Sequence, residues 1–104
     1  MVTTWPVLTE AFYLLEEAGR AAQESLIDLV VNGRIVAYDV SDPVRLQVLL
    51  HKYADRPMDL ADGTLVVLAE QLRLYRVFTL DWADFSTYRA HGRRAFGVIP
   101  ARPG

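Results

Sequence analysis

The stretch ADGTLVVLAEQLRLYRVFTLDWADF, residues 61–85, places acidic residues near both ends of a helix–strand unit. Its first part predicts a helix that buries four apolar residues: Leu65, Leu68, Ala69 and Leu72. The run YRVFTLD that follows is rich in β-branched and aromatic residues, which predicts a buried strand. Asp62 lies in the first turn of the helix, and Asp81 and Asp84 follow the strand. These acids are either capping groups or carboxylates gathered at one edge of a sheet to hold a metal.

Two further helix patterns follow a short β-prone run, VTT, at residues 2–4. PVLTEAFYLLEEAG predicts a helix that starts near Pro6 and ends at Gly19. Its apolar residues at helical spacing are Val7, Ala11, Leu14 and Ala18. RAAQESLIDLVVNG predicts a second helix, ended by Asn32-Gly33. The residues that it turns inward are Ala22, Leu26, Leu29 and Val30.

The middle and the end of the chain add two strand patterns and a helix start. RIVAYDV is apolar on both faces except for Asp39, which predicts a strand covered by helices on both sides. Asp42 as N-cap and Pro43 at the first helical position predict the start of a helix in SDPVRLQVLLHKY. RAFGVIP predicts a last strand, closed by Pro100. Strands that alternate with helices indicate an α/β fold with a mostly parallel sheet.

Length and composition indicate one globular domain, residues 1–104, of 11.7 kDa. The chain has no cysteine, which excludes a disulfide framework and a thiolate metal site. No apolar run approaches the ~20 residues of a spanning helix, and no basic-then-apolar leader is present. We therefore expect a cytoplasmic protein that makes no membrane contact.

The charge of the chain gives no general signal for nucleic-acid binding, because the net charge is −2 and the pI about 5.6. Ten of the eleven basic residues are nevertheless arginine, and several fall late: Arg89, Arg93, Arg94 and Arg102. Arginine presents planar, bidentate donors that suit phosphate. A solvated, slightly basic tail is the simpler interpretation of these residues.

Four acids are expected near one edge of the sheet, because sites in parallel α/β folds form at the carboxyl ends of the strands. They are Glu10, Asp62, Asp81 and Asp84. Clustered carboxylates repel one another unless a cation neutralises them. Oxygen ligands without histidine or cysteine select Mg²⁺ or Mn²⁺ over zinc. Such a metal can orient a water nucleophile and stabilise charge on a phosphodiester.

Each acid also has a simpler explanation when it is taken alone. Asp59 and Asp62 suit helix capping, because acids in a first turn stabilise a helix by ~0.3–1 kcal/mol. Asp81 is placed to cap a following turn, and Asp84 and Glu10 are placed to be solvated. Spacing alone does not decide between capping and metal binding.

Taken together, these motifs resemble the PIN-domain family, in its VapC-like group of ribonucleases. YADRPMDLADGTLVVLAEQLRLYRVFTLDWADFSTYR, residues 53–89, is similar to the second half of such a domain. There an aspartate opens the late helix, and a strand ends in Thr-x-Asp followed by x-x-Asp-Phe. VTTWPVLTEAFYLL, residues 2–15, is similar to the family's second strand and the helix that carries its glutamate. The resemblance implies a three-layer α/β fold with a short, mostly parallel sheet flanked by helices.

The resemblance also implies a function. Such domains are Mg²⁺- or Mn²⁺-dependent nucleases, often toxins that cut RNA and are silenced by an antitoxin protein. The matching positions would make Glu10, Asp62 and Asp81 catalytic, metal-binding acids, with Asp84 as a fourth ligand or a group behind the ligands. Asp59 precedes the motif and is interpreted as a helix cap.

The chain departs from the family pattern at its start. The family begins with a strand that ends in an aspartate, followed by one or two helices, whereas this chain begins in the likeness of the second strand. It is therefore expected to be N-terminally truncated, with one metal ligand missing. Three interpretations are open: a fragment or misplaced start; direct pairing of VTT with RVFTL in an inactive remnant; or a second copy that fills the gap in a homodimer.

Two functions follow from these observations. The first is a metal-dependent endoribonuclease. The alternative is a non-catalytic PIN-like module that acts through dimerisation or through binding an antitoxin-like partner, motivated by the apolar surface that the missing strand would uncover.

Overall fold

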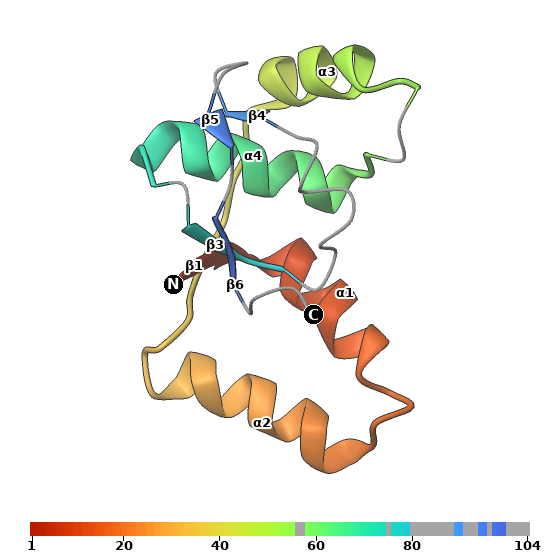
Figure 1. Cartoon of the computed structure of the whole chain (residues 1–104), viewed down its shortest axis with the longest axis vertical. Coiled ribbons are helices and arrows are strands. Elements are labelled where there is room, and N and C mark those ends of the chain that lie inside the picture. The colour runs from red at the N-terminus through yellow and green to blue at the C-terminus, as the bar shows by residue number, and fades with distance from the viewer. Residues whose placement is uncertain (56–57, 75, 80–88, 91–93, 96, 100–104) are drawn as a thin grey trace.

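The computed structural model describes residues 1–55, 58–74, 76–79, 89–90, 94–95 and 97–99 (Figure 1). The described helices are α1 (Trp5–Leu14), α2 (Arg20–Val31), α3 (Pro43–Lys52) and α4 (Leu60–Leu72). One sheet contains β1 (Val2–Thr4), β2 (Val36–Tyr38), β3 (Arg76–Phe78) and β6 (Gly97–Ile99). A separate two-stranded ladder joins β4 (Arg89–Ala90) to β5 (Arg94–Ala95).

The four-stranded sheet has the order β2-β1-β3-β6, and its described pairs are all parallel. The chain forms β2 on one side of β1 and returns through α3 and α4 to form β3 on the other side. This confirms the predicted α/β class with a mostly parallel sheet. The prediction of a single strand in RAFGVIP is wrong, because its residues are divided between β6 and β5, which pairs antiparallel with β4.

β1 and β3 pair directly, but over a short length. β1 has three register pairs with β2 and only one with β3, between Val2 and Val77. The Thr3 hydroxyl extends this contact by donating a hydrogen bond to the carbonyl oxygen of Phe78 at 3.0 Å. Direct pairing of these two strands agrees with the pairing that the second of the three interpretations assumes, whereas the truncation and the inactivity in that interpretation stay predictions.

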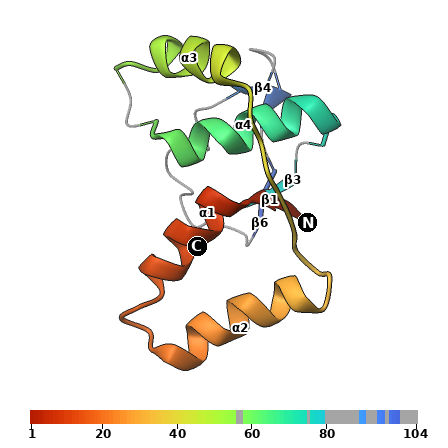
Figure 2. The same ribbon diagram turned by 180° about the vertical axis from the view of Figure 1, so that it is seen from behind.

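Helices cover both faces of the sheet, which gives three layers. In Figures 1 and 2, α3 and α4 lie on one side of the strands, and α1 and α2 lie on the other. Successive side chains of β3 pack in clusters on opposite faces of the sheet. Val77 belongs to the apolar cluster around α4, and Phe78 to the cluster that contains Leu26 of α2. This alternation is the one expected of a strand between two layers.

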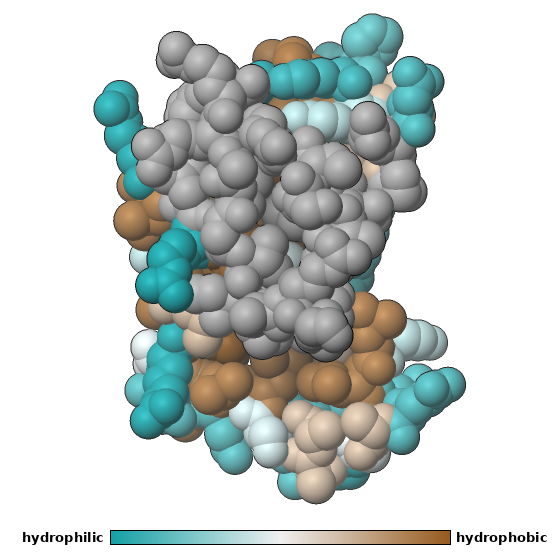
Figure 3. All heavy atoms as spheres, in the orientation of Figure 1, coloured by the Kyte–Doolittle hydropathy of each residue, from teal (hydrophilic) through white to brown (hydrophobic). Residues whose placement is uncertain are grey.

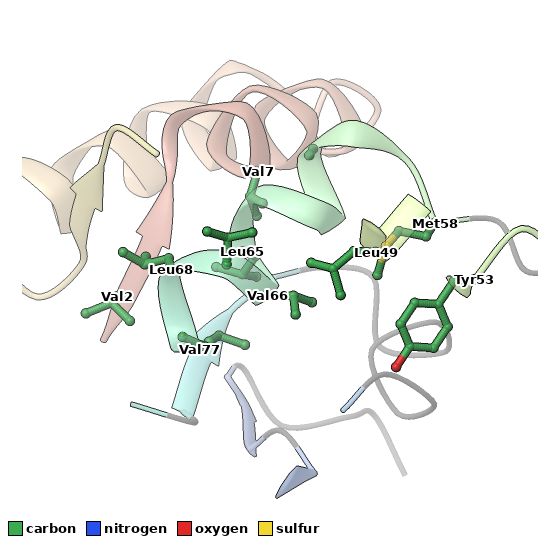
Figure 4. Close-up of a cluster of buried hydrophobic side chains, with 12 residues drawn as sticks. Val2, Val7, Leu49, Tyr53, Met58, Leu65, Val66, Leu68 and Val77 are labelled. Carbon is green, nitrogen blue, oxygen red and sulfur yellow. The ribbon is translucent and has the colours of Figure 1, made fainter. Parts of the chain in front are cut away.

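α4 lies at the centre of the larger apolar cluster (Figure 4). Every residue from 61 to 70 is buried, so the helix is enclosed and has no polar face. Leu65, Leu68 and Ala69 are buried as predicted. The prediction for Leu72 is wrong, since it is 37% exposed in the last turn, where the helix leaves the core.

α1 is shorter than the sequence pattern indicates. It ends at Leu14, and the following hydrogen bonds, such as Ala18 N–H to Leu15 O at 3.1 Å, span three residues. The tighter turns rotate later side chains off the buried face, so Ala18 is exposed, contrary to prediction. Leu14, in the last turn of α1, is also exposed, contrary to prediction. Gly19 does not end α1 but is the N-cap of α2, with a φ of 102° that favours glycine.

α2 and the strand after it agree with the prediction only in part. α2 buries Leu26 and ends at Asn32, as predicted. β2, however, is an edge strand of the described sheet, and Val36 is 44% exposed rather than covered on both sides. Ile35, just before the strand, is the residue that enters the core. A short apolar run does not indicate whether its strand lies at the edge or the centre, because that depends on strand order.

α3 begins as predicted and is joined to α4 by an ion pair. The Asp42 side chain accepts a hydrogen bond from the Arg45 backbone N–H at 3.0 Å, and Pro43 is the first helical residue. The Arg45 guanidinium donates to Glu70, from Nε to Oε1 at 2.9 Å and from Nη2 to Oε2 at 2.8 Å. The hydrogen bond to Glu70 raises the pKa of Arg45 although burial opposes it, so the guanidinium stays charged at physiological pH.

Replacing Arg45 by Met is expected to lower the free energy of unfolding by about 1–3 kcal/mol, because the largely buried Glu70 carboxylate loses its guanidinium. The loss should stay below that of a fully buried pair, because the Arg45 side chain is 33% exposed. Urea unfolding followed by circular dichroism measures the change. Gln47→Met on the exposed side of α3 is the matched control and should change stability by less than about 0.5 kcal/mol. Equal stability of Arg45→Met and the wild type would contradict a stabilising ion pair.

Candidate metal centre

The first turn of α4 lies at the carboxyl edge of the sheet, beside the start of α1. α4 leads into β3 and runs back along the sheet, so its amino end lies where β1 passes into α1. A buried contact fixes this placement, because the hydroxyl oxygens of Thr4, at the end of β1, and Thr64, in α4, are 2.8 Å apart. Sites of parallel α/β folds form at this edge.

Two aspartates cap the amino end of α4 reciprocally. The Asp59 carboxylate accepts a hydrogen bond from the backbone N–H of Asp62 at 2.9 Å, and the Asp62 carboxylate accepts one from the N–H of Asp59 at 3.3 Å. This arrangement is a capping box. The predicted capping role of Asp59 is therefore confirmed. The two hydrogen bonds also hold both carboxylates in a defined orientation.

A third carboxylate, that of Glu10 in α1, lies close to this pair. One carboxylate oxygen from each of Glu10, Asp59 and Asp62 lies within 4.8 Å of the other two. Asp62 is only 1% exposed, whereas Asp59 is exposed and Glu10 is accessible to solvent. The group is therefore buried at Asp62 and accessible to solvent at Asp59 and Glu10.

The donors of this group fit a hard divalent cation. Three carboxylates without histidine or cysteine favour Mg²⁺ or Mn²⁺ over zinc. Two oxygens on opposite sides of Mg²⁺ stand about 4.2 Å apart, twice the Mg–O distance of ~2.1 Å. Oxygens on adjacent sides of the ion stand about 3.0 Å apart. The three oxygens lie within 4.8 Å of one another, so the carboxylates are near enough to turn toward one shared ion.

The charge of the group also favours a cation. The amino end of α4 contributes a partial charge of about +0.5, which stabilises each carboxylate near it. When all three carboxylates are ionised, that partial charge alone does not balance them. A divalent cation would supply further compensation.

The structure places the predicted site residues as follows. Glu10 and Asp62 lie together at the expected edge of the sheet, and their role as ligands stays a prediction. Asp81 and Asp84 lie outside the described residues. The sequence predicted only a capping role for Asp59, and gave no indication of its place among the three carboxylates. The spacing of Asp59 and Asp62 within one helical turn was the available signal, because it sets both acids at the same helix end.

An apolar groove of about 230 Å³ lies between α1 and α2, apart from the carboxylates. Its lining residues are Trp5, Leu8, Thr9, Phe12, Tyr13 and Ile27. Trp5 is 48% exposed and Tyr13 is 75% exposed. Figure 3 shows apolar side chains gathered over this part of the molecule. The surface is a candidate for contact with another protein.

Comparison with known proteins gives one partial relative. Ribonuclease VapC26 of Mycobacterium tuberculosis (strain ATCC 25618 / H37Rv) is 40% identical over 52 residues. The matched segment is 50% of this chain but only 38% of the relative. No family model matches the chain. The similarity suggests a relation to the VapC-like group of the PIN-domain family.

Among the helices of the described residues, none has the length and apolar character needed to cross a membrane.

Asp59→Ser is expected to keep the helix cap and remove one carboxylate, because serine also accepts a hydrogen bond at the N-cap. Its free energy of unfolding without metal should stay within about 0.5 kcal/mol of the wild type, whereas Asp59→Ala should lose about 1 kcal/mol. Both variants should bind Mn²⁺ at least about tenfold more weakly than the wild type. Urea unfolding and titration calorimetry measure the two effects. If Asp59→Ser binds Mn²⁺ with wild-type affinity, Asp59 caps the helix and is not a metal ligand.

Proposed function

We propose that this protein is a metal-dependent endoribonuclease of the PIN-domain, VapC-like type, which hydrolyses RNA phosphodiester bonds. The observation that carries the proposal is the meeting of Glu10, from α1, with Asp62, from α4, at the carboxyl edge of the sheet. The partial similarity to a ribonuclease supports RNA as the substrate.

Glu10, Asp62 and Asp81 are the proposed catalytic acids and hold Mg²⁺ or Mn²⁺. Asp84 is a further proposed ligand, and the position of Asp59 makes it another. The bound cation would orient the phosphodiester and stabilise negative charge as its bond is cleaved. The acids hold the cation where Asp59 and Glu10 are accessible to solvent, so that a long RNA strand can approach.

Two further assignments belong to the same proposal. The late arginines Arg89, Arg93 and Arg94 bind the RNA backbone, because guanidinium groups pair with phosphate through two donors. The protein acts in the cytoplasm on cellular RNA, and an antitoxin protein silences it there.

Asp62→Asn is expected to reduce Mg²⁺-dependent cleavage of a fluorescent RNA by at least about 100-fold. Loss of a residue that hydrogen-bonds to a metal ligand reduces activity by about 10–100-fold, and loss of a ligand itself should reduce it more. Asparagine keeps the shape and an oxygen for the capping box, so the variant should remain folded. Asp81→Asn should lose activity similarly. Glu24→Gln, at an exposed position of α2, is the matched control and should retain full activity.

Cleavage that persists in EDTA, or that survives in folded Asp62→Asn, would contradict the proposal. Absence of Mg²⁺-dependent cleavage by the wild type across a panel of structured and single-stranded RNAs would also contradict it.

A second candidate function is favoured by the groove between α1 and α2. In this case the chain is a non-catalytic PIN-like module that dimerises or binds an antitoxin-like partner through apolar contacts. We expect the mass from sedimentation equilibrium to be twice the monomer's 11.7 kDa, or to rise only with a partner. Ile27→Lys in the groove should abolish association, whereas Asp62→Asn should not. A monomer that binds no partner would contradict this function.

A further inference from the structure

The amino end of α1 departs from ordinary helix capping. Thr4 is the N-cap residue, with extended φ and ψ of −119° and 158°, yet its side chain makes no capping hydrogen bond. A threonine at this position usually accepts a hydrogen bond from the second or third helical N–H. Pro6 has no N–H to donate, but Val7 has one. The Thr4 hydroxyl instead contacts the hydroxyl of Thr64 in α4, at 2.8 Å.

The direction of the hydrogens in this contact follows from its surroundings. The Thr64 hydroxyl lies 2.6 Å from the carbonyl oxygen of Ala61, which can only accept. Because a hydroxyl has one hydrogen, the hydrogen between the two threonines comes from Thr4. Thr4 therefore donates to Thr64, which donates to the backbone of the first turn of α4. Both threonines are buried, so water does not compete for these bonds.

The two elements joined by this contact carry the two carboxylates that meet at the edge of the sheet. Asp62 lies between Ala61 and Thr64, and Glu10 lies in the helix that Thr4 begins. A small slide of α1 along α4 would separate their oxygens, which now lie within 4.8 Å. Apolar burial resists separation of the helices but is non-directional. Hydrogen bonds depend on distance and angle, so they can fix the register between helices.

We propose that Thr4 and Thr64 are positioning residues of the metal centre. Their hydroxyl pair fixes α1 against α4 so that Glu10 and Asp62 share one cation. This inference rests on the proposed function in that a divalent cation binds at these acids. The two threonines act through the backbone of α4 and the start of α1, and they are not ligands themselves.

The test replaces the hydroxyl pair by valine, which keeps the shape of threonine. Thr64→Val alone leaves the buried Thr4 hydroxyl without an acceptor and should destabilise the protein. Thr4→Val alone leaves the Thr64 hydroxyl bonded to the Ala61 carbonyl and should destabilise the protein less. The double variant replaces both partners by apolar groups of the same shape, so its free energy of unfolding should be close to that of the wild type. Folding and metal binding can therefore be separated in the double variant.

Titration calorimetry with Mn²⁺ gives the deciding measurement. The double valine variant is expected to bind Mn²⁺ about tenfold more weakly than the wild type. Thr4→Ser and Thr64→Ser keep the hydroxyls and should bind within about twofold of the wild type. Thr9→Val is the matched control in α1, because the Thr9 hydroxyl donates only to the Trp5 carbonyl at 2.9 Å on the exposed side. Its Mn²⁺ affinity should not change.

Weaker Mn²⁺ binding by the folded double variant, with recovery in the serine variants, supports the positioning role. Wild-type affinity in the double variant overturns it and leaves the proposed ribonuclease intact. A double variant that does not fold also overturns it, because the pair would then be needed for the fold rather than for the site. Absence of Mn²⁺ binding by the wild type overturns both proposals together.

Discussion

The structure depends on α4, a helix that is buried along most of its length and carries an acid near each end. Burying an ionised carboxylate is unfavourable unless hydrogen bonds or opposite charge compensate it. Near the carboxyl end, Glu70 receives two hydrogen bonds from Arg45 of α3. Near the amino end, Asp62 accepts the Asp59 N–H and lies beside the carboxylates of Asp59 and Glu10. The enclosure that excludes water from Asp62 also strengthens its attraction for a cation.

Local signals in the sequence predicted the order of the main elements and most of the core of α4. The start of α3 was predictable because Asp42 and Pro43 act through short-range geometry, which the sequence shows directly. The end of α1 was not predictable, because apolar spacing continues past Leu14 into turns. The position of β2 at the sheet edge depends on strand order, which no local pattern carries.

Two of the three carboxylates of the candidate site were indicated by the sequence, and the third was not. The resemblance to the PIN-domain family indicated Glu10 and Asp62, and the carboxyl-edge rule for parallel sheets indicated that they would meet. Neither indicated that Asp59 lies close enough to join them while it caps α4. That position follows from the packing of α1 against the first turn of α4, where the buried Thr4 and Thr64 hydroxyls meet. Such a contact joins distant parts of the chain and leaves no pattern in either.

The central claim is that the carboxylates of Glu10, Asp59 and Asp62 line a divalent-cation site. Anomalous diffraction from crystals soaked in Mn²⁺ tests it most directly. We predict one strong anomalous peak within about 2.5 Å of oxygens from Glu10 and Asp62. A well-ordered site that shows no peak, with Mn²⁺ bound elsewhere or not at all, would contradict the claim.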